Sequence, residues 1–195
     1  MGRVTAEWKV SALDETTWPL FAELVAHCDG YPSGCWCMGF HPEGLDKGPD
    51  HAATNRQRKM ERVFAGTAHA ALVVDDGVCI GWCQFGSTDE LPRIKNQAVY
   101  ERSRTTVPDW RIACFYVAKG YRRKGVALAA LEGALTLIAG LGGGVVEGYP
   151  EPAGAVPAGF LFHGALSSFE QLGFRRDRMI GKHRWVVTRV VDAVP

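Results

Sequence analysis

A basic, glycine-containing turn in the middle of the chain constrains its fold more than any other feature. The turn reads Val117-Ala118-Lys119-Gly120-Tyr121-Arg122-Arg123-Lys124-Gly125-Val126-Ala127. It follows residues 110–117, whose apolar side chains fall on both faces as in a central strand. After it, apolar residues recur at helical spacing, namely Leu128, Leu131, Leu135 and Ile138. The pattern predicts a central strand, a tight turn and a helix over 124–139 that packs on the sheet.

The turn has the chemistry of an anion-binding site. The free amides of a first helical turn point at a ligand, Gly125 lets the backbone approach it closely, and the helix dipole favours negative charge. Arg122, Arg123 and Lys124 add positive charge. A diphosphate would suit this cradle, whereas a P-loop is not indicated because no Gly-Lys-Ser/Thr run is present. The alternative is a solvated helix start in a doubly wound α/β domain.

The rest of the sequence predicts one mixed α/β domain over residues 1–195, because 47% of the residues are hydrophobic and no linker divides the chain. Strands are predicted over 7–13, 69–74, 78–85, 145–149, 174–180 and 183–191. Further helices are predicted over 14–28, 52–65 and 161–172. Two long stretches, 29–50 and 86–109, are predicted to be irregular.

The turn and the order of elements resemble the GNAT superfamily of acyl-CoA-dependent N-acyltransferases. Arg122-x-x-Gly125-x-Ala127 is similar to its pyrophosphate motif, and Phe169-Glu170-Gln171-Leu172-Gly173-Phe174 is similar to its aromatic-Glu-x-Leu-Gly-Phe signature. The resemblance implies a mostly antiparallel central sheet, flanked by helices, with a V-shaped splay between two central strands. It also implies transfer of an acetyl group from acetyl-CoA to a primary amine of a small-molecule or peptide acceptor, by direct attack in a ternary complex.

The resemblance further implies a set of cofactor contacts. Backbone amides near Phe115 and Val117 would bond the thioester carbonyl and the pantetheine arm, and would hold the oxyanion. His163 stands near a position where many members have a cofactor-contacting asparagine, although such a histidine is more often structural or exposed. The expected cofactor-binding residues are Phe115, Tyr116, Val117, Arg122, Arg123, Lys124, Gly125, Val126, Ala127 and His163.

Two residues are expected to handle protons. An alkyl amine has a pKa of about 10.4, so it needs a proton acceptor before it attacks. Glu147 is the candidate, in a strand that the resemblance places opposite Val117; the alternative is a strand-end carboxylate without a catalytic role. Phe169 replaces the tyrosine that often protonates the departing thiol, so Ser168, another nearby side chain or water is expected to do so. This replacement motivates a second hypothesis, an inactive acyl-CoA-binding module.

Aromatic residues in the loops and the second hairpin strand are candidates for an acceptor pocket. Trp36, Phe40 and Trp82 are expected to line it, with core packing as the alternative. Four residues nearby have the ligand types of zinc: Cys28, Cys35, Cys37 and His41. Their spacing is not that of a zinc knuckle, so no metal site is predicted.

The charge balance argues against two classes of partner. Lys and Arg number 22 against 21 Asp and Glu, a net charge of +1, so neither nucleic acid nor an anionic membrane is expected. The first nine residues lack the apolar core of a signal peptide, and no apolar run approaches the length of a bilayer span. We therefore expect a cytoplasmic protein with reduced cysteines, and a homodimer is a further hypothesis.

Overall fold

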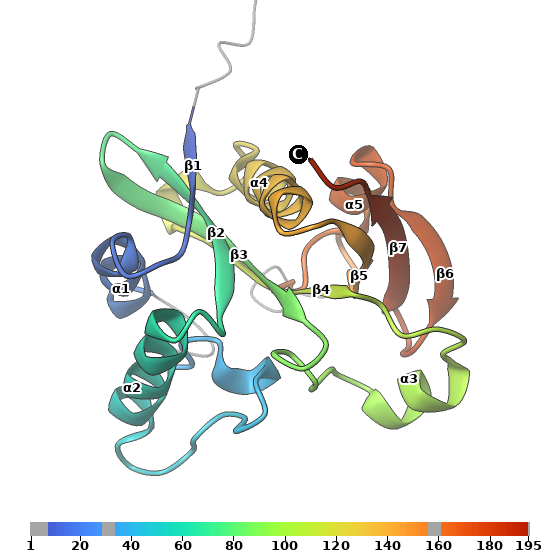
Figure 1. The fold of residues 1–195 in the computed structure, drawn as a ribbon, viewed down its shortest axis with the longest axis horizontal. Coiled ribbons are helices and arrows are strands. Elements are labelled where there is room, and N and C mark those ends of the chain that lie inside the picture. Colours follow the sequence, from blue (N-terminus) through green and yellow to red (C-terminus); the bar gives the residue numbers. More distant parts are fainter. Residues whose placement is uncertain (1–7, 29–33, 156–160, 195) are drawn as a thin grey trace, which may run out of the picture.

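The computed structural model describes residues 8–28, 34–155 and 161–194. Within them, one sheet has the strand order β1-β2-β3-β4-β5-β7-β6 (Figure 1). Neighbouring strands are antiparallel except for the parallel pair β4 and β5. This arrangement confirms the predicted mixed, mostly antiparallel sheet.

The strands are β1 (Lys9–Ala12), β2 (His69–Asp75), β3 (Val78–Ser87), β4 (Trp110–Val117), β5 (Gly144–Gly148), β6 (Arg175–Met179) and β7 (Trp185–Val191). The helices are α1 (Trp18–Ala26), α2 (His51–Phe64), α3 (Gln97–Ser103), α4 (Val126–Gly140) and α5 (Leu166–Gln171). Two short 3₁₀ helices are η1 (Met38–Phe40) and η2 (Lys119–Tyr121). The strand predictions are confirmed to within two residues at each end, although the predicted start at Glu7 lies outside the described residues.

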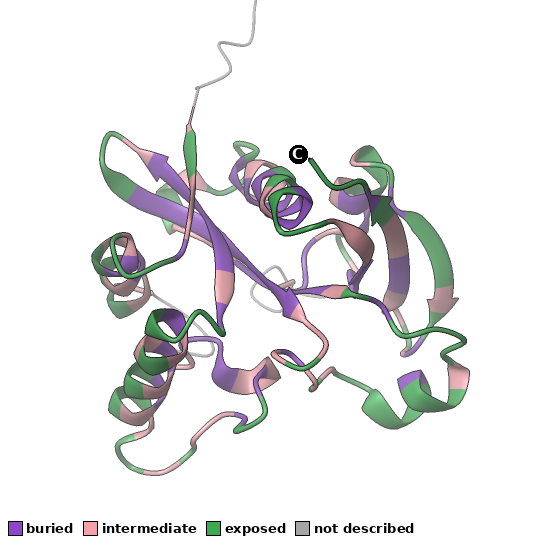
Figure 2. Ribbon diagram, viewed as in Figure 1, coloured by how far each residue is buried: buried purple, intermediate pink, exposed green. Residues whose placement is uncertain are grey.

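Helices cover both faces of the sheet. Successive side chains of a strand point to opposite faces, so the strands contribute to two apolar clusters, one on each face. On one face α4 buries its apolar stripe against side chains such as Cys83 and Phe85 of β3. On the other face Trp82, the residue before Cys83, packs with Phe21 of α1 at a ring-centroid distance of 4.9 Å. The central strands are consequently buried along most of their length (Figure 2). This double burial explains why β3 and β4 have near-continuous apolar sequences.

The strands β4 and β5 separate soon after they begin to pair. Residues 110–112 pair with residues 146–148, and β4 then continues to Val117 without β5 beside it. Along its other edge β4 stays paired with β3 as far as Val117 opposite Gly81. One edge of residues 113–117 therefore opens into a splay, as the resemblance implied.

Two predictions of local structure are wrong. The stretch 86–109, predicted to be irregular, contains α3, which buries Tyr100. The helix predicted over 161–172 is confined to α5, because residues 161–165 run as a turn in which Gly164 has a φ of +85°. We call residues 161–165 the strap.

The first helix is also shorter than predicted, beginning at Trp18 rather than Asp14. The Asp14 carboxylate accepts hydrogen bonds from the backbone N–H groups of Thr16 (2.8 Å) and Thr17 (3.0 Å). An aspartate bonded to its own following backbone stabilises a turn in competition with a helix. The side chain therefore delays the start of α1.

Gly148 in β5 allows α5 to lie close to the sheet. A Cβ at this position would overlap the ring of Phe169, which is fully buried. We expect Gly148→Ala to lower the free energy of unfolding by about 1–3 kcal/mol through overpacking, measured by urea denaturation. Gly140→Ala is the control, because a Cβ there meets nothing within 4 Å. Equal unfolding midpoints for the two variants would contradict the expectation.

Candidate active site

The turn between β4 and α4 leaves the first backbone amides of the helix without hydrogen-bond acceptors in the helix. Gly125 precedes α4 with a φ of +97°, a conformation that favours glycine, and no side chain caps the helix. The amide of Ala129 bonds the carbonyl of Gly125 (3.0 Å), which leaves the preceding amides of α4 without a helical acceptor. Arg122 and Arg123 are exposed beside them. The arrangement suits an anion, as the sequence predicted.

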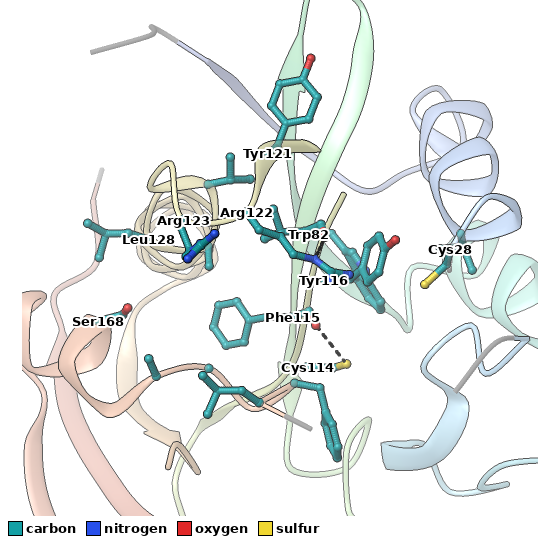
Figure 3. A pocket seen from close by; sticks show the side chains of 18 of the residues that line it. Cys28, Trp82, Cys114, Phe115, Tyr116, Tyr121, Arg122, Arg123, Leu128 and Ser168 are labelled. Carbon is teal, nitrogen blue, oxygen red and sulfur yellow. Dashed lines mark hydrogen bonds between the residues drawn. The ribbon is translucent and has the colours of Figure 1, made fainter. Parts of the chain in front are cut away.

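A pocket of about 420 Å³ begins at this turn and continues along β4 (Figure 3). Phe115 lies between Ser168 on α5 and Tyr116 on the side of α1, so the pocket passes from one layer of the molecule to the other. Most residues expected in the site line it, namely Trp36, Trp82, Phe115, Tyr116, Val117, Arg122, Arg123, Gly125, Val126, Ala127 and Ser168. The fold thus brings together segments that are far apart in the sequence.

Three other expected residues do not line the pocket. Lys124 lies with its Nζ 5.3 Å from the ring centre of Tyr121. The ring of Phe40 packs edge-on against His163, with 5.3 Å between centroids. His163 is buried, burial lowers its pKa well below the ordinary value, and neither ring nitrogen has a hydrogen-bond partner among the described residues. The expected contacts of these three residues with ligands find no support in their positions.

The expected position of Glu147 is wrong, because the register pairs it with Arg111 rather than placing it opposite Val117. Its Oε2 accepts hydrogen bonds from the hydroxyls of Tyr100 (2.8 Å) and Tyr149 (3.0 Å). The residue is only 2% exposed and does not line the pocket. Its Oε1 lies 3.8 Å from a guanidinium nitrogen of Arg178, so the buried carboxylate ties β5 to Tyr100 of α3 and to Arg178 of β6. Its geometry fits a structural group better than a base.

Two backbone groups on the open edge of β4 already have partners within the chain. The amide of Phe115 donates to the carbonyl of Phe162 in the strap (2.7 Å). The carbonyl of Val117 accepts from Nε of Arg122 (3.1 Å). Because edge groups alternate along a strand, the amide of Val117 faces the same side as that of Phe115. A ligand that bonds to this edge of β4 would therefore have to replace the hydrogen bond from Phe115 to the strap or the one from Arg122 to Val117.

Several lining residues were not predicted from the sequence. Four belong to the strap (Leu161, Phe162, Gly164 and Ala165), three are thiols (Cys28, Cys35 and Cys114), and the others are Val25, Gly34, Tyr121 and Leu128. No described group of three or more His, Cys, Asp or Glu residues is arranged to hold a metal ion. The pKa of Cys35 is raised, first by its hydrogen bond with Cys37 and then by burial, so this thiol stays protonated and is a weak nucleophile.

A buried lysine lies behind the pocket wall. Nζ of Lys59 is 3.0 Å from Nε2 of His41, whose Nδ1 donates to the carbonyl of Glu90 (3.0 Å). Burial lowers the pKa of Lys59 to about 8 and that of His41 to about 2. The ammonium lies 5.8 Å from the ring centre of Trp82, which lines the pocket. A positive charge thus stands directly behind one wall.

Comparison with known proteins defines the family. Residues 36–147, more than half of the chain, match the model of the acetyltransferase (GNAT) family. The chain therefore belongs to the GNAT acetyltransferase family, and it is an acetyltransferase. No curated protein sequence matches the chain.

Solved structures of low sequence identity share the fold. A Corynebacterium glutamicum protein, histone acetyltransferase HPA2 and related acetyltransferase, superposes with a TM-score of 0.57 at 12% identity, over 96% of this chain and 98% of that one. The mosquito arylalkylamine N-acetyltransferase like 5b gives 0.53 at 12% identity, over 94% and 100%. The Escherichia coli N-acetyltransferase of a ribosomal-protein alanine gives 0.50 at 12% identity, over 96% and 96%. These likenesses confirm the fold.

A structural role for Glu147 predicts how Glu147→Gln behaves. The amide oxygen could still accept from both hydroxyls, but without the negative charge these bonds weaken and the ion pair with Arg178 (3.8 Å) is lost, so the free energy of unfolding should fall by about 1–3 kcal/mol. Because residue 147 is outside the pocket, the variant and the wild type should show the same change of melting temperature when acetyl-CoA is added. Wild-type stability combined with a loss of turnover of about 10²-fold or more would instead identify Glu147 as the base.

The buried Lys59 predicts a pH dependence of stability. Its pKa falls from the ordinary 10.5 to about 8 on folding, so between these pH values the unfolded chain binds more protons than the folded one. Stability should therefore rise with pH across this window, by roughly 3 kcal/mol relative to Lys59→Met. Urea denaturation at pH 7.5 and 10.5 measures the difference. Lys47→Met, at an exposed lysine, is the control, and a difference no larger than the control's would contradict the prediction.

Proposed function

We propose that the protein transfers an acetyl group from acetyl-CoA to a primary amine of a small-molecule or peptide acceptor, by direct attack within a ternary complex. The observation that carries the proposal is the pocket that begins at the uncapped start of α4 and continues along β4. The family supplies the acetyl-transfer activity, and the names of two structural neighbours refer to amine acceptors.

The residues at the α4 turn fit the diphosphate of acetyl-CoA. Gly125 keeps the approach open, since even a Cβ there would meet nothing nearer than 3.9 Å. The amides of Val126 and Ala127 would donate to phosphate oxygens, and Arg122 and Arg123 would balance their charge. Acetyl-CoA, when bound, supplies an acetyl group already activated as a thioester.

Within the splay, the chain would position the acetyl carbonyl and the leaving group. The amide of Val117 faces the splay and would donate to the bound ligand, and that of Phe115 would do so after leaving the carbonyl of Phe162. Ser168 lines the pocket and would donate a proton toward the departing sulfur. Because a thiol has a pKa of about 8.5, the thiolate leaves readily even without this help.

The proton of the attacking amine would leave through water. Among the described residues that line the pocket, none is a carboxylate or an imidazole. Glu147, the candidate named from the sequence, is buried against two tyrosine hydroxyls and does not line the pocket, which argues against it as the base. The amine must therefore reach the thioester in its neutral form, and the protein favours that form by other means.

An acyl-CoA-binding module without turnover is the second candidate. It is favoured by the buried Phe169 at the position of the usual tyrosine and by the bond between Phe115 and Phe162 that occupies the open edge of β4. Both candidates bind acetyl-CoA, but only an enzyme releases free CoA thiol faster than a blank across a panel of amines.

None of the described helices has the length and apolar composition needed to cross a bilayer. The cytoplasmic location and the homodimer stay predictions.

The anion-binding turn before α4 predicts that a negative charge at Gly125 prevents acetyl-CoA binding. We expect acetyl-CoA at millimolar concentration to raise the melting temperature of the wild type, and Gly125→Glu to abolish the increase, because the new carboxylate enters the diphosphate site. Gly120→Glu is the matched control, since it adds the same charge to the same turn outside the pocket. Wild-type binding by Gly125→Glu would overturn the cofactor assignment.

A further inference from the structure

Three aromatic side chains wall the pocket away from the α4 turn, and each already has a cation over its ring. We call Trp36, Trp82 and Phe162 the aromatic wall. Cζ of Arg56 lies 5.8 Å from the ring centre of Trp36, Nζ of Lys59 lies 5.8 Å from that of Trp82, and Nζ of Lys95 lies 5.3 Å from that of Phe162. The three cations come from α2 and from the segment before α3. The wall is therefore electrostatically positive from several directions.

Such a wall is unfavourable for a protonated amine. The negative face of an aromatic ring attracts an ammonium, but here each ring already interacts with a cation of the protein. A second cation beside it is repelled, and nearby positive charges lower the pKa of a bound amine. The wall therefore selects the neutral form of an acceptor.

The other lining groups do not reverse this preference. The titratable side chains among them are thiols, phenols and two arginines, and burial raises the pKa of Tyr116 to about 12. Within the described residues no anionic side chain lines the pocket to pair with an ammonium. An acceptor whose amine is neutral at pH 7 needs no such partner and no base.

We infer that the acceptor is a weakly basic aromatic amine whose ring packs against Trp36, Trp82 and Phe162. The inference rests on the proposed acetyl transfer and names its substrate class. The amine nitrogen attacks the thioester carbon, the new C–N bond forms as the C–S bond breaks, and the nitrogen's proton passes through water to the CoA thiolate. The products are the N-acetyl arylamine and free CoA thiol, with no other reactant.

Two isomeric amines test the inference, since 4-methylaniline and benzylamine have the same atoms but only benzylamine is largely protonated at pH 7. With acetyl-CoA and release of CoA thiol as the readout, we expect kcat/KM to favour 4-methylaniline by about tenfold or more. In the double variant Arg56→Met/Lys95→Met, this preference should shrink by about three- to tenfold, because two cations beside the rings are lost. The control Arg58→Met/Arg93→Met removes two charges from the same segments and should keep the wild-type preference.

The outcomes separate the inference from the function on which it rests. A wild-type preference for benzylamine at pH 7, or an equal change of preference in both double variants, overturns the aromatic-amine assignment alone. No release of CoA thiol with any amine, aromatic or aliphatic, overturns the proposed function and the assignment together. Because all four substituted residues are at least partly exposed, melting curves should show folded variants.

Discussion

The early separation of β4 from β5 is the constraint on which the site depends. Backbone groups in a buried strand need hydrogen-bond partners, and a longer parallel pairing would have supplied them for the whole of β4. Since pairing stops at Ile112 opposite Gly148, the edge beyond it must bond to something else. The chain supplies the carbonyl of Phe162 and the guanidinium of Arg122, and a ligand that lies along β4 competes with both.

The sequence predicts those features that depend on short-range pattern. The apolar run of β4, the glycine turn and the stripe of α4 are each visible within a dozen residues, and the structure reproduces β4 at its predicted bounds. The pairing of β5 with β4 is a long-range property, and nothing within residues 145–149 encodes which part of β4 they meet. A shift of six positions along β4 therefore moved Glu147 from the splay to the closed end of the sheet, beside Tyr100.

The strap and the burial of Lys59 were not predicted because both depend on contacts between residues far apart in the sequence. Leu161, Ala165 and Phe169 follow helical spacing, but Gly164 adopts a positive φ and the strap bonds to β4, so a long-range contact prevailed over the local pattern. Lys59 lies in a helix of mostly polar sequence. Its burial depends on His41, from a loop eighteen positions away in the sequence, which accepts its hydrogen bond.

Positive charge lies at both ends of the pocket. At the α4 turn, Arg122, Arg123 and the helix amides suit an anionic cofactor, and behind the aromatic wall Lys59 carries a charge that no described carboxylate balances at hydrogen-bonding distance. Keeping that ammonium buried costs stability at neutral pH. The same charge lowers the pKa of any amine bound beside Trp82, which is the effect a general base would otherwise have to provide. If the proposed acceptor binds there, a group that destabilises the fold would favour the neutral, nucleophilic form of its amine.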